Sequence, residues 1–472
     1  MMLRRWGVTM ALLTCLVPPL QAQRNLDTHF RSISWEGYQN RAVELFREYL
    51  RIDTSNPPGN ELAAAEFFHR LFDAAGIPNT TYTYAPGRAN LYAILKGDGS
   101  LRPLILLNHT DVVRAEPQHW RLPPFSGDLL EGEIYGRGAV DMKDEGVIQA
   151  MVMLMAAREH LPRKRDLVFL ATADEEVGGT GTQWMIANHA ELLRPAEYLI
   201  TEGGSNLLDS QGRALYGVGV GEKMPCWVRL TARGRGGHGS MPIADSAPNR
   251  LVRALQRVVD WESPVRLLPG VEKYFHEVAE LQSEPHAEKF RNIRAALRDP
   301  SFLKSLSEDE DYNYLLRDTI SLTVLRAGEQ TNVIPDSAYC ELDVRLLPDR
   351  GSEEFLRELK RVVADDSIEI QPLSTTRTPN SSPVDTSLYR IIEQVARQLN
   401  PKALVAPALN SGYTESQIYR TLGIHCYGFG QVEITPQVDA SQHAANERLP
   451  TEQIRRGVRL LYEIVARAVN EP

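Results

Sequence analysis

Short, continuous apolar runs alternate with helix-like segments along most of this 472-residue chain, and this alternation limits the fold more than any other feature. The clearest runs lie at 104–107, 167–170 and 198–200. Uninterrupted apolar strands of this length are typical of parallel sheets, because such strands are buried on both faces. We therefore predict an α/β fold in which layers of helices enclose a mostly parallel, mixed sheet.

Two helices should cover this sheet. The segment 145–160 is apolar on nearly all sides and carries Met151 and Met155, which predicts a buried helix whose methionines fill the core. The closing segment begins at Thr451 and places Val458 on the same side as the other apolar residues near it. This spacing predicts an amphipathic helix on the outside of the sheet.

The segment 217–373 has a different pattern. Apolar and polar residues alternate, as in antiparallel strands with one solvated face, along 226–232, 320–325 and 339–346. Helices are expected near 245–260 and 352–364. We interpret the segment as an inserted α+β (ferredoxin-like) domain, itself interrupted by an acidic, aromatic stretch at 272–318. The flanking parts, 23–216 and 374–472, would then form one discontinuous domain.

The residues 1–22 have the pattern of a signal peptide. Arg4 and Arg5 precede an apolar run at 7–20, and the small Ala22 follows it. The run is short for a membrane span and is broken by prolines, although an uncleaved anchor is the alternative. We expect an exported protein, periplasmic or secreted, with no stable membrane span in the mature chain.

Charge and cysteine content exclude two classes of protein. The formal net charge is −9, from 52 basic and 61 acidic residues, which argues against a broad electrostatic nucleic-acid binder. Cys15 lies in the predicted signal peptide, where lipid attachment is an alternative although Thr14 stands where a smaller residue is expected. The remaining cysteines cannot form a complete disulfide framework; they are Cys226, Cys340 and Cys426.

Side chains that can bind a metal follow each of the three buried runs. In chain order they are His109 with Asp111, Asp174 with Glu175 and Glu176, and Glu202. Because ligands of open parallel sheets bind beyond the carboxyl ends of the strands, these side chains should converge on one crevice. Asp141, on a glycine-bounded loop, and His443, near the C-terminus, can reach the same place. Together they form a nitrogen and oxygen ligand set that suits zinc.

As an ordered series these motifs resemble the di-zinc exopeptidase and amidohydrolase family of glutamate carboxypeptidase, carboxypeptidase S, aminoacylase, succinyl-diaminopimelate desuccinylase and peptidase T. The resemblance covers essentially the whole mature chain and implies an α/β/α catalytic domain with an inserted dimerisation or lid domain. It is carried by the segments 109–113, 120–125, 136–143, 174–179, 202–204, 237–240, 331–335 and 443–447.

The resemblance implies two Zn²⁺ ions per chain, with Co²⁺ or Mn²⁺ as alternatives. Asp141 would bridge the two ions. His109 and Glu202 would complete the site of one ion, and Glu176 and His443 the site of the other. The family also implies a cis peptide bond after Asp141.

Three further residues acquire catalytic roles by resemblance. Asp111 would fix the orientation of the His109 ring. Glu175 would be the general base; the alternative is that Glu175 is only a surface residue next to Glu176. His238, in a glycine-rich segment, would hydrogen-bond the developing oxyanion, often in the partner subunit's active site; the alternative is a turn histidine without a catalytic part.

Asn332, Arg345 and Gly412 match family positions that bind the carboxylate end of the substrate. A guanidinium can contact a carboxylate with two hydrogen bonds, although Arg345 could instead belong to a structural ion pair. The chain departs from the family pattern next to several site residues, and these departures place the substrate pocket in doubt but remove no ligand: Asn108, Arg114, Asp144, Glu145, Glu415 and Ala444.

We therefore expect an exported zinc-dependent hydrolase that cleaves an amide bond next to a free C-terminal carboxylate. It would be a carboxypeptidase, dipeptidase or N-acyl-amino-acid amidohydrolase, most like the carboxypeptidase S branch, acting on small peptides or N-acyl amino acids. The alternatives are an aminopeptidase of the same family and a non-catalytic homologue that keeps the fold. Homodimerisation through the inserted domain is also expected.

Overall fold

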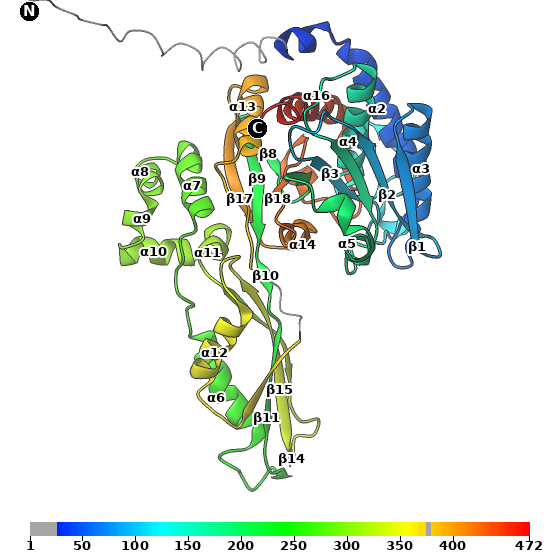
Figure 1. Ribbon diagram of the computed structural model, residues 1–472. Helices are drawn as coiled ribbons and strands as arrows, with labels where there is room; N and C mark the ends of the chain where they lie inside the picture. Colours follow the sequence, from blue (N-terminus) through cyan, green and yellow to red (C-terminus); the bar gives the residue numbers. More distant parts are fainter. Residues whose placement is uncertain (1–25, 374–378) are drawn as a thin grey trace, which may run out of the picture.

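The computed structural model describes residues 26–373 and 379–472 and shows a molecule with two parts (Figure 1). A ten-stranded sheet and its helices form a broad body, from which a five-stranded sheet with two helices extends as an elongated arm. The predicted signal peptide, including Cys15, lies outside the described residues. No helix in the described ranges combines the length and hydrophobicity that a membrane span requires.

The centre of the large sheet is parallel. Four strands lie side by side in the order β6 (Leu167–Thr172), β3 (Leu104–His109), β7 (Tyr198–Thr201) and β18 (His425–Gly428). Every residue of β3, β6 and β7 is buried, as the continuous apolar runs predict. The remaining strands of this sheet are β1 (Asn79–Ala85), β2 (Arg88–Leu95), β8 (Asn206–Leu208), β9 (Ala214–Glu222), β17 (Leu404–Asn410) and β19 (Glu433–Ile434). The predicted α/β class with a mostly parallel, mixed sheet is confirmed.

Alternate side chains of the central strands enter two different cores, because successive residues of a strand point to opposite faces. Leu104 and Leu106 of β3 join one core, whereas Ile105 and Leu107 join the other. The first core is shared with α2 (Trp35–Leu50), α3 (Glu61–Ala74), α4 (Lys143–Arg158), α13 (Ser387–Leu399) and α16 (Thr451–Ala468). The second core is shared with α5 (Thr180–Leu193) and α14 (Ser416–Arg420).

The two helices predicted over the sheet are present. α4 buries Met151 and Met155, as expected for methionines that fill a core. α16 buries Val458 and the other apolar residues of its inner face. Gly146 lets α4 approach β3 closely, because a Cβ at this position would lie 3.0 Å from Asn108 Oδ1.

The arm has the order of a ferredoxin-like fold. All strand pairs in its sheet are antiparallel, in the order β13-β15-β11-β16, and α6 and α12 pack on one face. In chain order the elements are β11 (Val228–Arg233), α6 (Ala247–Val259), β13 (Thr319–Arg326), β15 (Ser337–Leu346), α12 (Ser352–Val363) and β16 (Ile368–Pro372). The alternation predicted for half-solvated strands is clearest in β15, where every second residue is buried. The predicted α+β character of the insert is confirmed.

The acidic, aromatic stretch interrupts the arm in sequence but packs on the large sheet. Its helices surround Phe275 and Phe290, in a core that also contains Ala406 and Leu409 of β17 (Figure 1). They are α7 (Pro269–Val278), α8 (His286–Arg291), α9 (Ile293–Ala296), α10 (Pro300–Ser307) and α11 (Glu310–Leu316).

The chain crosses from the large sheet to the arm at Lys223. β9 stays in the large sheet up to Glu222, and β10 (Met224–Pro225) already pairs with β15 of the arm. The domain boundaries drawn from the sequence stay a prediction. All three cysteines outside the predicted signal peptide are buried free thiols, Cys226, Cys340 and Cys426.

Candidate metal centre

Three buried strands end next to one another at one edge of the large sheet. His109, the last residue of β3, lies opposite Thr172, the last residue of β6, and β7 is in parallel register with β3. The residues that follow β6 and β7 therefore emerge at the same edge as His109. These residues include Glu175, Glu176 and Glu202, which were expected to converge there.

Asp141 lies between two histidines. Its Oδ1 atom is 3.0 Å from His109 Nε2, and its Oδ2 atom is 3.1 Å from His443 Nε2. Glu202 lies on the His109 side, 3.7 Å from Nε2, and Glu176 lies on the His443 side, 3.2 Å from Nε2. The five side chains thus form two groups that share the carboxylate of Asp141. The peptide bond after Asp141 is cis, as the resemblance implied.

The spacing of these groups fits two divalent ions. Ligand atoms bound about 2.0–2.1 Å from one tetrahedral ion lie roughly 3.3 Å from each other, and the nitrogen to oxygen separations across Asp141 and its neighbours run from 3.0 to 3.7 Å. Glu176 Oε1 is buried and has no hydrogen-bond partner in the described part of the chain, a need that a cation would satisfy. Imidazole nitrogens with carboxylate oxygens suit zinc and similar metals.

The charges of the cluster favour added positive charge. Hydrogen bonds that His443 donates to the carboxylates of Asp141 and Glu176 raise its pKa to about 10. Burial opposes a charge on His109, but Glu202 and the other nearby carboxylates raise its pKa well above the ordinary value. Burial likewise opposes the charge of Asp141, yet the two histidines hold its pKa below the ordinary value.

Glu175 lies beside the ligand groups. Its carboxylate is within 4.8 Å of the ligand atoms of His109 and Glu202. Burial, followed by the negative charge of Glu202, raises the pKa of Glu175 well above its ordinary value. A carboxylate placed in this way can accept a proton next to a metal pair and later release it.

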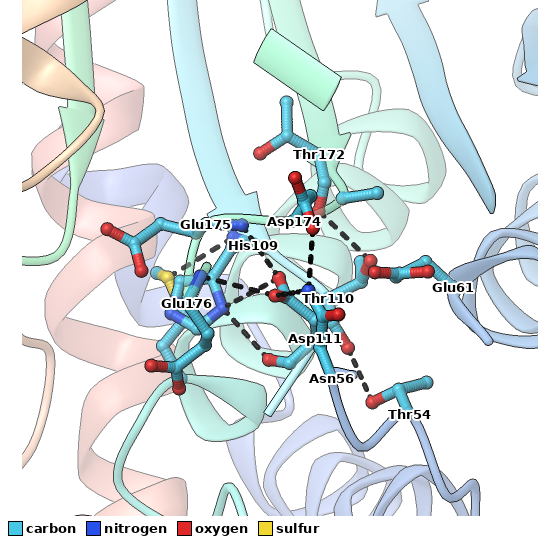
Figure 2. A network of polar contacts seen from close by, with 12 residues as sticks. Thr54, Asn56, Glu61, His109, Thr110, Asp111, Thr172, Asp174, Glu175 and Glu176 are labelled. Carbon is cyan, nitrogen blue, oxygen red and sulfur yellow. Dashed lines mark hydrogen bonds and ion pairs between the residues drawn. The ribbon is translucent and has the colours of Figure 1, made fainter. Parts of the chain in front are cut away.

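Asp111 connects His109 to the loop that carries both glutamates (Figure 2). The backbone N–H groups of Glu175 and Glu176 donate to Asp111 Oδ1 and Oδ2 at 3.0 and 3.2 Å. The nearer partner of His109 Nδ1 is the backbone carbonyl of Asp111, at 3.0 Å, while the carboxylate lies 3.6 Å away. Asp111 therefore contacts the ring through its main chain and holds the glutamate loop through its side chain.

Sequence reasoning missed the part that Glu447 plays at this centre. Its carboxylate is fully buried and accepts hydrogen bonds from Arg137 at 2.5 Å, from the Gly138 N–H at 2.9 Å and from the Asp141 N–H at 3.2 Å. Burial raises the pKa of Glu447 to about 7. Glu447 holds the loop that presents Asp141, and its position four residues after His443 was the only signal for this role in the sequence.

The loop after β17 brings Gly412 close to the third strand end. A Cβ built on Gly203 would lie 3.0 Å from Thr414 and 3.5 Å from Asn410, so the loop packs directly against the residue after Glu202. The N–H of Gly412 donates to Asn410 Oδ1 at 2.9 Å. Gly412 therefore belongs to a loop that contacts the residue after Glu202.

His238 and Asn332 lie at the far tip of the arm, away from the metal centre of the same chain (Figure 1). β12 (Gly237–His238) pairs there with β14 (Val333–Ile334), and the N–H of Gly239 donates to the Asn332 carbonyl at 2.7 Å. Both predicted residues are exposed. The structure therefore does not bring them together with the ligand groups of their own chain.

Arg345 lies at the opposite end of the arm, where the chain crosses to the large sheet. It is paired with Pro225 of β10, and its guanidinium contacts Asp343 at 2.8 and 3.2 Å. The same guanidinium lies 5.9 Å from the centre of the Trp227 ring. Arg345 thus takes part in an ion pair, the alternative that its strand position left open.

Known proteins resemble this chain along most of its length. A family model described as peptidase family M20/M25/M40 matches residues 105–467. The chain is 27% identical over 429 residues to N-fatty-acyl-amino acid synthase/hydrolase PM20D1 of Homo sapiens, covering 88% of this chain and 84% of that protein. It is 28% identical over 444 residues to aminoacylase-1 of Homo sapiens, covering 92% and 97%. The M20 family metallo-carboxypeptidase Sso-CP2 from Sulfolobus solfataricus has the same fold, with a TM-score of 0.66 at 18% identity over 90% of this chain and 98% of that one.

Proposed function

Because the chain belongs to the peptidase family M20/M25/M40 and is a hydrolase of amide bonds in peptides or N-acyl amino acids, we propose that it cleaves the bond next to a free carboxylate with the help of two zinc ions. The observation that carries this proposal is the pair of histidine and carboxylate groups that share Asp141. Export is proposed with it, from the signal-peptide pattern of 1–22.

In the proposed enzyme, His109 and Glu202 would hold one ion, Glu176 and His443 would hold the other, and Asp141 would contribute to both. When bound, such a pair lowers the pKa of a water molecule and polarises the scissile carbonyl. The raised pKa of Glu175 makes this carboxylate a better proton acceptor. In each turnover Glu175 would accept a proton and then give it to the leaving nitrogen, which regenerates the carboxylate.

The proposed contacts for the substrate carboxylate lie where the large sheet meets the arm. The N–H of Lys223, at the crossing, donates to the Asn410 carbonyl at 2.8 Å, next to the Gly412 loop. Arg345 lies in the arm beside the same crossing. In this proposal, Gly412 and Arg345 would bind the free carboxylate of the substrate, for which a guanidinium is well suited.

A homodimer is proposed because two site residues cannot act on the metal centre of their own chain. His238 and Asn332 lie at the arm tip, so a second chain must receive them if they contact substrate (Figure 1). β13 is an edge strand of the arm sheet, and an unpaired edge of this kind can pair with another chain. Large apolar side chains are exposed on β13 and on the neighbouring α6, namely Leu322, Leu325, Val252 and Val259.

Two matched substrate series test the proposed specificity. One series has blocked N-termini, and the other has amidated C-termini, each assayed with and without a chelator and with zinc restored. We expect activity to survive N-terminal blocking, to vanish on C-terminal amidation and to require metal. The opposite response to the two blocks would identify an aminopeptidase, and activity that resists chelation would overturn the metal mechanism. Sedimentation at assay concentration tests the dimer, which a fully active monomer would exclude.

A further inference from the structure

A chain of buried and half-buried polar side chains runs from the metal centre to the beginning of β2. We propose that Arg88 and Asn56 are positioning residues that set the geometry of the two glutamates at the centre. Figure 2 shows the part of this chain that contains Asn56, Asp111 and Asp174. The inference rests on the proposed function, because it concerns the same centre. Neither residue belongs to the ligand set, and neither stands in a motif that predicted a site.

The contacts form a continuous path. Arg88 contacts Glu61 through Nε and Nη2, at 2.6 and 2.7 Å, and contacts Asp174 Oδ1 through Nη2 at 2.6 Å. Asn56 Nδ2 donates to the same Asp174 oxygen and to Asp111 Oδ2, both at 2.8 Å. Asp111 in turn accepts the backbone N–H groups of the glutamate loop. Arg88 and Asn56 therefore reach the metal ligands through two carboxylates.

The charges along this path make Arg88 essential to its geometry. Glu61, Asp111 and Asp174 are all buried, and one carboxylate oxygen of each lies within 4.8 Å of the others. Three buried carboxylates at this distance repel one another unless a cation lies between them. The guanidinium of Arg88 is that cation, since it contacts two of the three, and Asn56 joins the third to the group. An arginine therefore holds this acidic trio together, whereas metal ions are proposed to hold the histidine and carboxylate groups around Asp141.

The backbone at Asp174 links this chain of contacts to the direction in which Glu175 and Glu176 leave β6. Asp174 has a φ of +72°, a left-handed conformation that is uncommon for a non-glycine residue and that side-chain contacts can stabilise. Its side chain is held by Arg88 and Asn56, and by the hydroxyl of Thr180. The two residues after this turn are Glu175 and Glu176. The side-chain contacts of Asp174 thus determine the direction in which the proposed base and one metal ligand leave β6.

The test compares loss of these contacts with loss of a buried, ion-paired arginine elsewhere. Arg88→Met removes the cation, Arg88→Lys keeps the charge without the forked geometry, and Asn56→Leu removes the amide at nearly constant volume. Arg165→Met is the matched control, because Arg165 is fully buried and forms an ion pair with Glu197 just before β6, at the opposite end of the same strand.

Four properties are measured on each full-length variant: thermal unfolding in the presence of a chelator, Zn²⁺ affinity by competition with a chromophoric chelator, the visible spectrum of the Co²⁺ form, and the kcat and KM of hydrolysis. We expect Arg88→Met and Asn56→Leu to weaken Zn²⁺ binding about 10–100-fold, the usual effect of residues that orient metal ligands, and to change the Co²⁺ spectrum. Arg88→Lys should recover part of the affinity. The kcat should fall with little change in KM.

Arg165→Met should lower the unfolding temperature while Zn²⁺ affinity and the Co²⁺ spectrum stay those of the wild type. If Arg88→Met and Asn56→Leu behave in this way too, the residues only stabilise the fold and the positioning role is wrong. If Arg88→Met does not fold, Asn56→Leu decides the matter alone. A wild-type protein that binds no zinc would instead reject the proposed function, so the two failures are distinguishable.

Discussion

The metal centre and the tip of the arm hold their predicted residues in opposite ways. At the centre, buried carboxylates from distant parts of the chain hold two of the proposed ligands, because Glu447 accepts the N–H of Asp141 and Asp111 accepts the N–H of Glu176. At the tip, His238 and Asn332 are exposed and rest on a two-stranded ribbon. The contrast teaches that the chain can bring the proposed metal ligands together by itself, whereas the tip residues would join a site only in the proposed dimer.

The largest effect expected is at the centre. Glu175→Gln should lower kcat about 10²–10⁴-fold, the range for loss of a general base, because an amide cannot accept the proton. Metal content, measured by elemental analysis, should stay near that of the wild type, since Glu175 is not one of the proposed ligands. Glu197→Gln, at the far end of the sheet, is the control. A variant that keeps most of its activity would show that the base lies elsewhere.

The second prediction tests whether the arm tip of one chain acts at the metal centre of its partner. His238→Ala should lower kcat about 10²–10³-fold, as for loss of one oxyanion donor. Co-expression with Glu175→Gln should restore activity, because each mixed dimer contains one centre with both Glu175 and the partner's His238. Random pairing of subunits gives about one quarter of the wild-type activity. If native mass spectrometry shows mixed dimers and activity does not return, the tip does not act across the dimer.

A smaller effect is expected where Glu447 supports the loop of Asp141. Glu447→Gln keeps the size of the side chain but replaces one accepting oxygen by an amide that cannot accept the N–H groups of the loop. We expect Zn²⁺ affinity to fall about 10–100-fold, measured by chelator competition. Unchanged affinity would mean that the loop holds Asp141 in place without this carboxylate.

The smallest effect concerns Lys223, at the crossing between the two regions. Burial lowers its pKa to about 7, and its Nζ donates to the Arg317 carbonyl at 2.7 Å. In the unfolded chain a lysine has a pKa of about 10.4. Between these values the unfolded state binds more protons, so this group makes the protein more stable as the pH rises, by about 2 kcal/mol from pH 7 to 9.

Denaturant unfolding at both pH values measures this contribution. Lys223→Met should be more stable than the wild type at pH 7, and the difference should shrink by about the same 2 kcal/mol at pH 9. Arg229→Met, which removes a half-buried ion pair in the arm, is the control for removal of a positive charge. A difference that does not change with pH would show that the Lys223 amine keeps its ordinary pKa in the folded protein.

Much of the fold could be predicted because it depends on local patterns. The continuous apolar runs of β3, β6 and β7 reflect burial on both faces, and the alternation in β15 reflects burial on one. The convergence of His109 with the residues after β6 follows from strand direction alone.

Other features could not be predicted because they depend on contacts between distant segments. Nothing near Arg88 indicates that it meets Asp174, 86 residues away, and nothing near Arg137 indicates that it meets Glu447, 310 residues away. The stretch at 272–318 carries no local sign that it packs on β17, since its apolar residues would bury equally well on the arm. Arg345 has a pattern that suits both a substrate contact and the ion pair with Asp343 that is observed.

By itself, the sequence determined the secondary structure, the α/β class and the set of residues able to bind metal, because hydrophobic periodicity and side-chain chemistry are local properties. Only the tertiary structure decided that Asp141 lies between two histidines, that an arginine holds the acidic trio of Glu61, Asp111 and Asp174, and that His238 lies far from its own centre. Each of these features depends on the distance between charged side chains from remote segments, and that distance is set only when the segments pack against one another.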